Sequence, residues 1–149
     1  TLEIVGDWWT LLIIRDAVLG VRRFGEFQKS LGIAKNILSN RLERLCEDGI
    51  LERGGSEMRP LYRLTEKGRG LVPALVALMQ WGDKWASGNK PPVIVTDTQG
   101  RPVAPVKLRG RSGDLEVQTI RFSPGPGATA RTRAFFDALS AAERRRVAR

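Results

Sequence analysis

The chain contains no histidine and only one cysteine among its 149 residues. Without histidine it lacks the commonest metal ligand and the commonest general base of enzymes. A single cysteine cannot form an intrachain disulfide bond or supply the several thiolates of a structural zinc site. These absences argue against an enzyme, and we expect neither a metal nor another cofactor. The lone Cys46 fits a reducing compartment, so we expect a cytoplasmic protein.

The sequence also lacks any apolar run near the roughly 20 residues that a membrane-spanning helix needs. We therefore expect no membrane insertion, and we see no signal peptide. Acidic side chains are scarce, with 16 Asp and Glu against 25 Lys and Arg. This excess of positive charge favours a polyanionic partner. It is concentrated in residues 87–149, which carry 12 basic and 5 acidic side chains, against 13 and 11 in residues 1–86.

The segment 22–65 carries the most information about fold. A short apolar pattern (Phe24–Leu31) ends at Gly32 and is followed by a longer amphipathic pattern from about Ala34 to Asp48, which Gly49 ends. Two alternating runs, 51–53 and 61–64, flank a turn rich in Gly and Pro and predict a hairpin. Helix, glycine turn, helix and basic hairpin in this order favour a winged helix-turn-helix.

The flanking regions complete the expected architecture. Thr10–Leu19 reads as a buried helix, and Thr65 as the N-cap of a helical region that becomes strongly periodic from Leu71. Ser87-Gly-Asn-Lys-Pro-Pro is the expected boundary between a domain of residues 1–86 and an extension of residues 87–149. The extension is expected to hold strands followed by a basic helical segment split at Ser140; the strands are 93–96, 103–108 and 115–122, and the helices are 130–139 and 141–148. The fold class is therefore mainly α with a β wing, plus a small C-terminal β-rich α+β extension.

The amphipathic helix at about 34–48 has the division of side chains that a major groove requires. Its leucines would hold it to the body while polar side chains face a duplex, where Asn can pair with adenine and Lys can reach guanine or phosphate. The side chains expected to read or flank bases are Lys35, Asn36, Ser39, Asn40 and Arg44. Those expected to hold phosphates are Arg22, Arg23, Arg41 and, near the wing tip, Arg59. Arg22 and Arg23, at the start of the preceding helix, would also offer free backbone N–H donors to a phosphate. Taken alone, such a helix is more often a solvated surface helix than a DNA-binding one. The preceding helix, the glycine turn and the basic hairpin together favour the DNA-binding interpretation.

These patterns also resemble the HxlR-type winged helix-turn-helix transcriptional regulators of bacteria. The matching segments are GDWWTLLIIRDAVLGVRRFGEFQKSLGIAKNILSNRLERLCEDGILER and YRLTEKGRGLVPALVALMQWGDKW, which together cover about residues 1–86. The resemblance implies a homodimer that binds a palindromic double-stranded DNA operator, with helix 34–48 in the major groove and wing 51–64 on the backbone or minor groove. Some members sense oxidants through a cysteine near the start of the first helix; that position would precede Thr1, and Cys46 does not match it.

The dimer would form through the first helix and the long helix after the wing. The interface residues expected on this basis are Trp8, Leu71, Leu75, Leu78, Met79, Trp81 and Trp85. The same long helix could line a pocket for a small-molecule effector of unknown identity, although packing between protomers explains its apolar residues without a ligand.

One alternative function stays open at this point. The winged helix could be a protein-interaction module, with any nucleic-acid contact supplied by the basic C-terminal extension. A chain ending at Trp85 would separate the two hypotheses, because it keeps operator binding only if the winged helix itself binds DNA.

Overall fold

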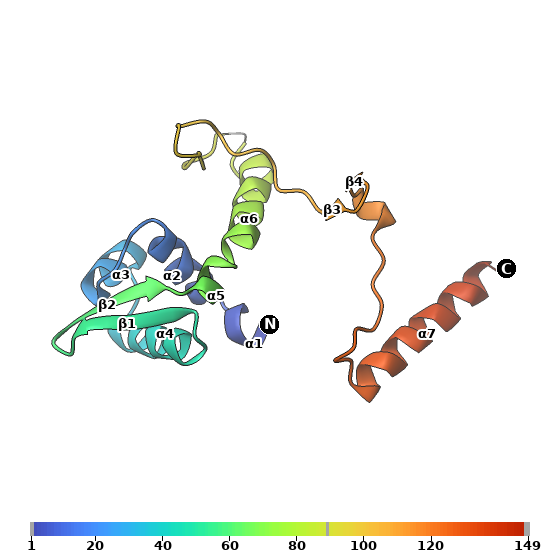
Figure 1. Ribbon diagram of the computed structural model, residues 1–149, viewed down its shortest axis with the longest axis horizontal. Helices are drawn as coiled ribbons and strands as arrows, with labels where there is room; N and C mark the ends of the chain where they lie inside the picture. Colours follow the sequence, from blue (N-terminus) through green and yellow to red (C-terminus); the bar gives the residue numbers. More distant parts are fainter. Residues whose placement is uncertain (1, 89, 148–149) are drawn as a thin grey trace. The chain divides into compact units, whose positions relative to one another are not determined.

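The computed structural model describes residues 2–88 and 90–147 and divides the chain into two compact units, Thr1–Val106 and Lys107–Arg149 (Figure 1). The first unit includes residues 87–106, so it extends beyond the boundary at residue 86 that the sequence predicts. Within the described residues, no helix is both long and apolar enough to cross a membrane.

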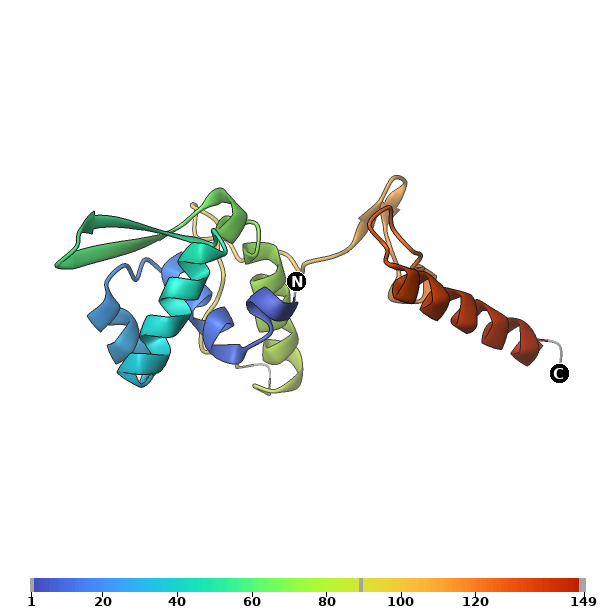
Figure 2. The same cartoon turned by 90° about the horizontal axis from the view of Figure 1, so that it is seen from below.

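The first unit holds six helices and one hairpin among its described residues. Their order is α1 (Leu2–Val5), α2 (Trp8–Val18), α3 (Phe24–Leu31), α4 (Lys35–Glu47), β1 (Leu51–Ser56), β2 (Arg59–Leu64), α5 (Glu66–Arg69) and α6 (Val72–Trp85). The winged helix-turn-helix expected from the sequence is thus confirmed. Figures 1 and 2 show the hairpin projecting beyond the helices of this unit.

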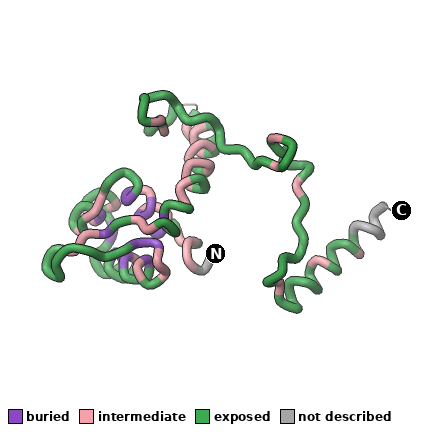
Figure 3. The backbone as a smooth tube through the Cα atoms, in the orientation of Figure 1, coloured by how far each residue is buried: buried purple, intermediate pink, exposed green. Residues whose placement is uncertain are grey.

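The core lies between α2, α3, α4 and the base of the hairpin, where the buried residues gather in Figure 3. Each element contributes its apolar positions, and the periodicity of the sequence correctly identified most of them. The fully buried apolar side chains include Ile13, Ile14, Phe27, Leu38, Leu42, Leu45 and Leu51. Apolar burial on this scale supplies the main driving force for folding and fixes the orientation of α4.

Two glycines set the sharp bends around the helix-turn-helix. Gly32 after α3 and Gly49 after α4 have φ values of 60° and 67°, in the left-handed region that favours glycine. Both helix ends were expected at these positions. The turn after Gly49 continues directly into β1, so the length of α4 determines where the wing begins.

The wing is longer than the sequence predicted. Its antiparallel strands pair from Leu51 with Leu64 out to Ser56 with Arg59, which leaves Glu57 and Met58 as a two-residue turn. The alternation in the sequence stops at Arg53 because Gly54 and Gly55 carry no side chain, although their backbones continue the ladder. A hydrogen bond from the Tyr62 amide to the Arg22 carbonyl, 2.8 Å long, ties the wing to the start of α3.

The C-terminal region contains both β and α structure, but less β structure than expected. Only β3 (Arg109–Gly110), β4 (Gly113–Asp114) and an isolated bridge between Thr96 and Pro102 form among the described residues. The predicted strand 115–122 is wrong, since Val117–Thr119 forms a 3-10 turn (η1). Its alternating apolar residues have no core to cover, and Val117 stays 74% exposed. Alternation predicts a strand only where one face becomes buried.

The final helix also differs from its prediction. α7 (Ala130–Val147) runs continuously through Ser140, where a break was expected. Serine costs only about 0.5 kcal/mol relative to alanine inside a helix, which is too little to divide a helix rich in Ala and Arg.

Candidate nucleic-acid interface

α4 separates its apolar and polar side chains as the sequence predicted. Leu38, Leu42 and Leu45 are buried against the body. The opposite face is exposed and carries Lys35, Asn36, Ser39, Asn40 and Arg44. All five predicted base-reading positions are therefore accessible to a partner.

The N-terminus of α4 has backbone donors available for an anion. Its N-cap is Ala34, which has no side-chain oxygen, and no side-chain cap forms there. The first amide groups of a helix lack intrahelical acceptors, and a phosphate is a ligand that suits them. Lys35 stands beside these amides, so this helix end combines unsatisfied N–H donors with positive charge.

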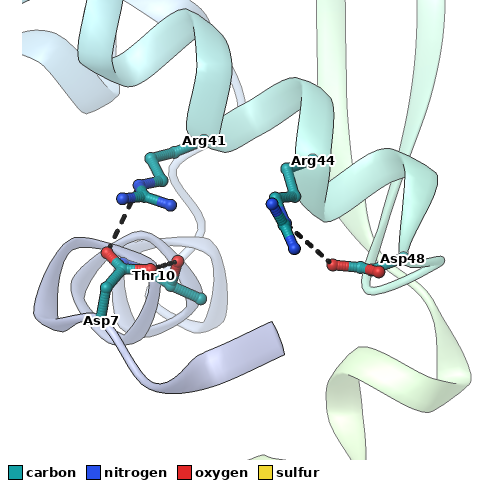
Figure 4. Close-up of polar contacts among 5 residues, drawn as sticks. All are labelled: Asp7, Thr10, Arg41, Arg44 and Asp48. Atoms are coloured by element: carbon teal, nitrogen blue, oxygen red, sulfur yellow. Dashed lines mark hydrogen bonds and ion pairs between the residues drawn. The ribbon is translucent and has the colours of Figure 1, made fainter. Parts of the chain in front are cut away.

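Arg41 and Arg44, which extend from α4, already contact carboxylates within the chain (Figure 4). The Nε atom of Arg41 lies 3.5 Å from Oδ1 of Asp7, and the Nε atom of Arg44 lies 3.9 Å from Oδ2 of Asp48. Arg44 remains mostly exposed, whereas Arg41 is more enclosed. A phosphate bound to Arg41 would therefore compete with Asp7 for the guanidinium.

Asp7 connects α4 to the start of α2. Its carboxylate is the N-cap of α2 and accepts a 3.0 Å hydrogen bond from the Thr10 amide and a second from the Thr10 hydroxyl. Partial burial alone would raise the pKa of Asp7, but the Thr10 hydrogen bonds and the Arg41 charge outweigh it and hold this pKa below its usual value. The sequence analysis did not identify Asp7 as a cap, although an Asp three residues before Thr10, at the start of an apolar run, is a recognised N-cap signal.

The two predicted phosphate clamps before α3 differ in what surrounds them. The Arg22 guanidinium donates through Nη1 to the carbonyl oxygens of Ala17 and Val21, so it caps the C-terminal end of α2. Arg23 is exposed and forms no ion pair with any residue that the structure describes. Arg23 is thus more accessible to a phosphate than Arg22.

One expectation about this segment is wrong. The backbone amides of Arg22 and Arg23 were expected to be available for phosphate, but both donate to Oε2 of Glu26, at 3.0 and 2.9 Å. These two hydrogen bonds hold the pKa of Glu26 below its usual value. The Glu26 carboxylate therefore already occupies the anion position at the start of α3.

The wing presents one predicted phosphate contact near its tip. Arg59 is the first residue of β2 and is exposed, beside a turn in which Met58 is 94% exposed. Gly55, at φ 79°, provides the left-handed conformation needed next to this turn. The register of the hairpin places Arg59 opposite Ser56, at the far end of the wing from the protein core.

The residues predicted for a dimer interface divide into two groups. Leu71 and Leu75 pack partly against the core of their own chain. Met79 is half-buried, and the other four residues face outward: Trp8, Leu78, Trp81 and Trp85 are between 56% and 66% exposed. Of the α6 residues, all of which the structure describes, none is buried. An apolar helix left this accessible is a surface suited to association.

Comparison with known proteins agrees with this geometry. The profile of the family described as HxlR-like helix-turn-helix matches residues 4–90. The uncharacterized HTH-type transcriptional regulator Rv3095 of Mycobacterium tuberculosis is 42% identical over 132 residues, which cover 85% of this chain and 84% of that protein. An alignment of this length extends beyond residue 90, so the similarity includes part of the C-terminal region.

Solved structures give the same result. The crystal structure of PA1607 superposes with a TM-score of 0.76 at 43% identity, covering 83% of this chain and 91% of that one. PA1374 from Pseudomonas aeruginosa gives 0.64 at 38% identity, covering 89% and 94%. The redox regulator HypR in its reduced form gives 0.53 at 28% identity, covering 59% of this chain and 93% of its own. The similarity to HypR is thus confined to a smaller part of this chain.

Proposed function

Because the chain belongs to the HxlR-like helix-turn-helix family of transcriptional regulators, we propose that it acts as a homodimer on a palindromic operator. The observation that carries the proposal is the exposed polar face of α4, whose leucines anchor it to the core while Lys35, Asn36 and Asn40 face solvent. A helix held this way can enter a major groove with its first turns against the base edges.

In this arrangement the four arginines expected to bind phosphate, Arg22, Arg23, Arg41 and Arg59, hold the DNA backbone. Arg23 and Arg59 are both exposed. Arg23 precedes α3, and Arg59 lies on the wing that follows α4. Arg44 would flank the bases from the second half of α4. Arg22 and Arg41 are assigned to phosphate as well, with the Arg41 contact formed at the expense of its ion pair with Asp7.

A second copy would supply the other half of the operator complex. We assign the interface to the exposed apolar side chains of α6 together with Trp8, with Met79 at the edge of the same face. Two-fold symmetry of the protein then predicts two equivalent half-sites separated by about one turn of DNA, roughly 10 base pairs.

Footprinting combined with stoichiometry tests this proposal. Duplexes selected from random sequence by the full chain should show a two-fold-symmetric protected region, and titration at high concentration should saturate at two chains per duplex. Protection of one half-site by one chain would contradict the dimer. Failure to select any sequence would contradict specific DNA recognition.

The excess positive charge of residues 87–149 favours one competing proposal, in which the extension makes the nucleic-acid contact. A chain ending at Val106, the boundary of the first unit, separates the two. Operator affinity retained in this shorter chain supports α4 as the contact, whereas affinity lost with a correctly folded first unit supports the extension.

A further inference from the structure

A pocket of about 400 Å³ lies at the junction between the end of α2, the base of the wing and the start of α6. It is separate from the exposed face of α4. Its lining includes three arginines, Arg22, Arg63 and Arg69, and a single carboxylate, Glu52. The rest of the lining is largely apolar, with Val18, Leu64 and Val72 among its members. The pocket therefore combines an apolar wall with a net charge of about +2, one carboxylate being set against three guanidinium groups.

Two guanidinium groups in this pocket have N–H donors that form no hydrogen bond with the described residues. Arg22 and Arg69 are each held through Nη1 alone, Arg22 by the carbonyls of Ala17 and Val21, and Arg69 by the Leu64 carbonyl at 2.7 Å. Within the described residues, their Nε and Nη2 atoms meet no acceptor. The backbone thus fixes two guanidinium groups in place without using their full hydrogen-bonding capacity.

The remaining two charged residues do not neutralise the pocket. Glu52 and Arg63 are partners in the register of the hairpin, yet they form no ion pair with each other or with another described residue. An arginine fork binds a planar carboxylate or a phosphate through paired N–H donors. An oxyanion entering here would find such donors already oriented.

We propose that this pocket binds a small organic oxyanion, with its charged group on the arginines and an apolar body against Val18, Leu64 and Val72. The volume lies in the range of pockets that enclose small ligands. A carboxylate and a phosphate ester share the required chemistry, and the size of the pocket favours a body about as large as one aromatic ring.

The position of the pocket gives the ligand a regulatory role, which rests on the proposed function. Arg22 begins the segment that leads into α3, Arg63 belongs to the wing, and Arg69 belongs to α5, which precedes α6. A bound anion would bridge these three elements. It would therefore bias the orientation of the DNA-binding elements relative to α6 and change operator affinity.

Calorimetric titration of the full chain without DNA tests the site itself. The probes are benzoate, phenyl phosphate, inorganic phosphate and, as the uncharged control, benzyl alcohol. We expect benzoate or phenyl phosphate to bind at least about tenfold more tightly than benzyl alcohol, because the alcohol leaves the guanidinium donors without an anion. The ratio of the first two probes identifies the preferred charged group. Equal binding of the alcohol, absence of binding by both aromatic anions, or inorganic phosphate binding as tightly as either of them would overturn the proposal.

Three variants locate the binding. The double variant Arg63→Gln and Arg69→Gln should lose about tenfold in affinity for the anion, while Arg53→Gln, which removes the same type of charge from the hairpin outside the pocket, should not. Glu52→Gln removes the one carboxylate of the pocket lining and should tighten binding of the anion, because a repulsive negative charge is lost. This variant tests the site independently if the double variant does not fold. Unchanged affinity in Glu52→Gln, or an equal loss in Arg53→Gln, contradicts the assignment.

Operator titration with and without the anion then separates this inference from the proposed function. If the chain binds the anion but selects no DNA sequence, the oxyanion site is supported and the proposed function as a DNA-binding regulator is refuted. Operator binding that Arg63→Gln and Arg69→Gln weaken, with no anion bound by the wild type, would instead assign these arginines to the DNA backbone and refute the site.

Discussion

At the scale of single residues, the side chains of the candidate interface differ in what already holds them. Asn36, Ser39 and Asn40 are exposed on α4, whereas Arg22 and Arg41 are bound within the chain. The residue types could be predicted from the sequence because helical periodicity shows which side of α4 faces outward. The carbonyl contacts of Arg22 could not, because they depend on how α2 ends beside the next segment in three dimensions.

This difference predicts that neighbouring arginines respond differently to the same substitution. Arg23→Ala should leave thermal stability almost unchanged and weaken binding to all DNA sequences. It should also lower the slope of log affinity against log salt by about 0.9 per chain, or about 1.8 for the dimer. Arg22→Ala should lower the free energy of unfolding by about 1–2 kcal/mol, because the carbonyls of Ala17 and Val21 lose a charged donor. Thermal melts and salt titrations measure both effects. Equal stability losses in the two variants would contradict the capping role of Arg22.

Asp7 gives a prediction about pH. Its pKa in the folded chain is lowered from the ordinary 3.8, so it stabilises the fold above that pH, and this contribution disappears as pH falls through the lowered folded-state pKa. Asp7→Ala should cost about 1 kcal/mol near pH 7 through loss of the α2 cap, and less in acid. Asp7→Asn should keep most of the cap and lose the pH dependence. Denaturant unfolding between pH 7 and pH 2.5 measures this, and a constant Asp7→Ala penalty across the range would contradict it.

At the scale of elements, the helix-turn-helix could be predicted well and the region after α6 could not. The ends of α3 and α4 follow from Gly32 and Gly49, and the start of α5 follows from Thr65, whose hydroxyl accepts a 3.0 Å hydrogen bond from the Gly68 amide. These signals are local. The strands expected after residue 92 would need a second layer to bury their apolar face, and an alternating sequence does not show whether such a layer exists.

The junction between the wing and α5 depends on one close approach that the sequence did not indicate. A Cβ atom at Gly68 would lie 2.2 Å from the carbonyl oxygen of Ile50, an atom of the backbone. Gly68→Ala should therefore lower the free energy of unfolding by about 2 kcal/mol or more, because α5 must move away from the wing. The control Gly25→Ala, at an exposed position of α3 with open space around its Cβ, should be neutral or stabilise the fold by about 0.5 kcal/mol. Similar melting temperatures for the two variants would contradict this packing.

Taken as a whole, the molecule combines a helix-turn-helix, an exposed apolar α6 and a basic C-terminal unit. The single chain leaves Trp81 and Trp85 accessible, which a dimer would cover. The sequence predicted these residues as interface residues from their helical spacing and from the family resemblance. Helical spacing cannot distinguish a face that packs on its own core from one that packs on a second copy, and Leu71 and Leu75 illustrate the first case.

The proposed function requires the first turns of α4 to read base edges. Selection of duplexes from random sequence, carried out in parallel with the wild type, Asn36→Ala and the control Glu47→Ala, tests it most directly. Glu47 is exposed at the last position of the same helix, about 16 Å further along the axis. We expect Asn36→Ala to relax base preference at one position in each half-site without changing the salt dependence. Glu47→Ala should select the same sequence as the wild type. An unaltered selected sequence with Asn36→Ala, at wild-type affinity, would contradict base reading by α4.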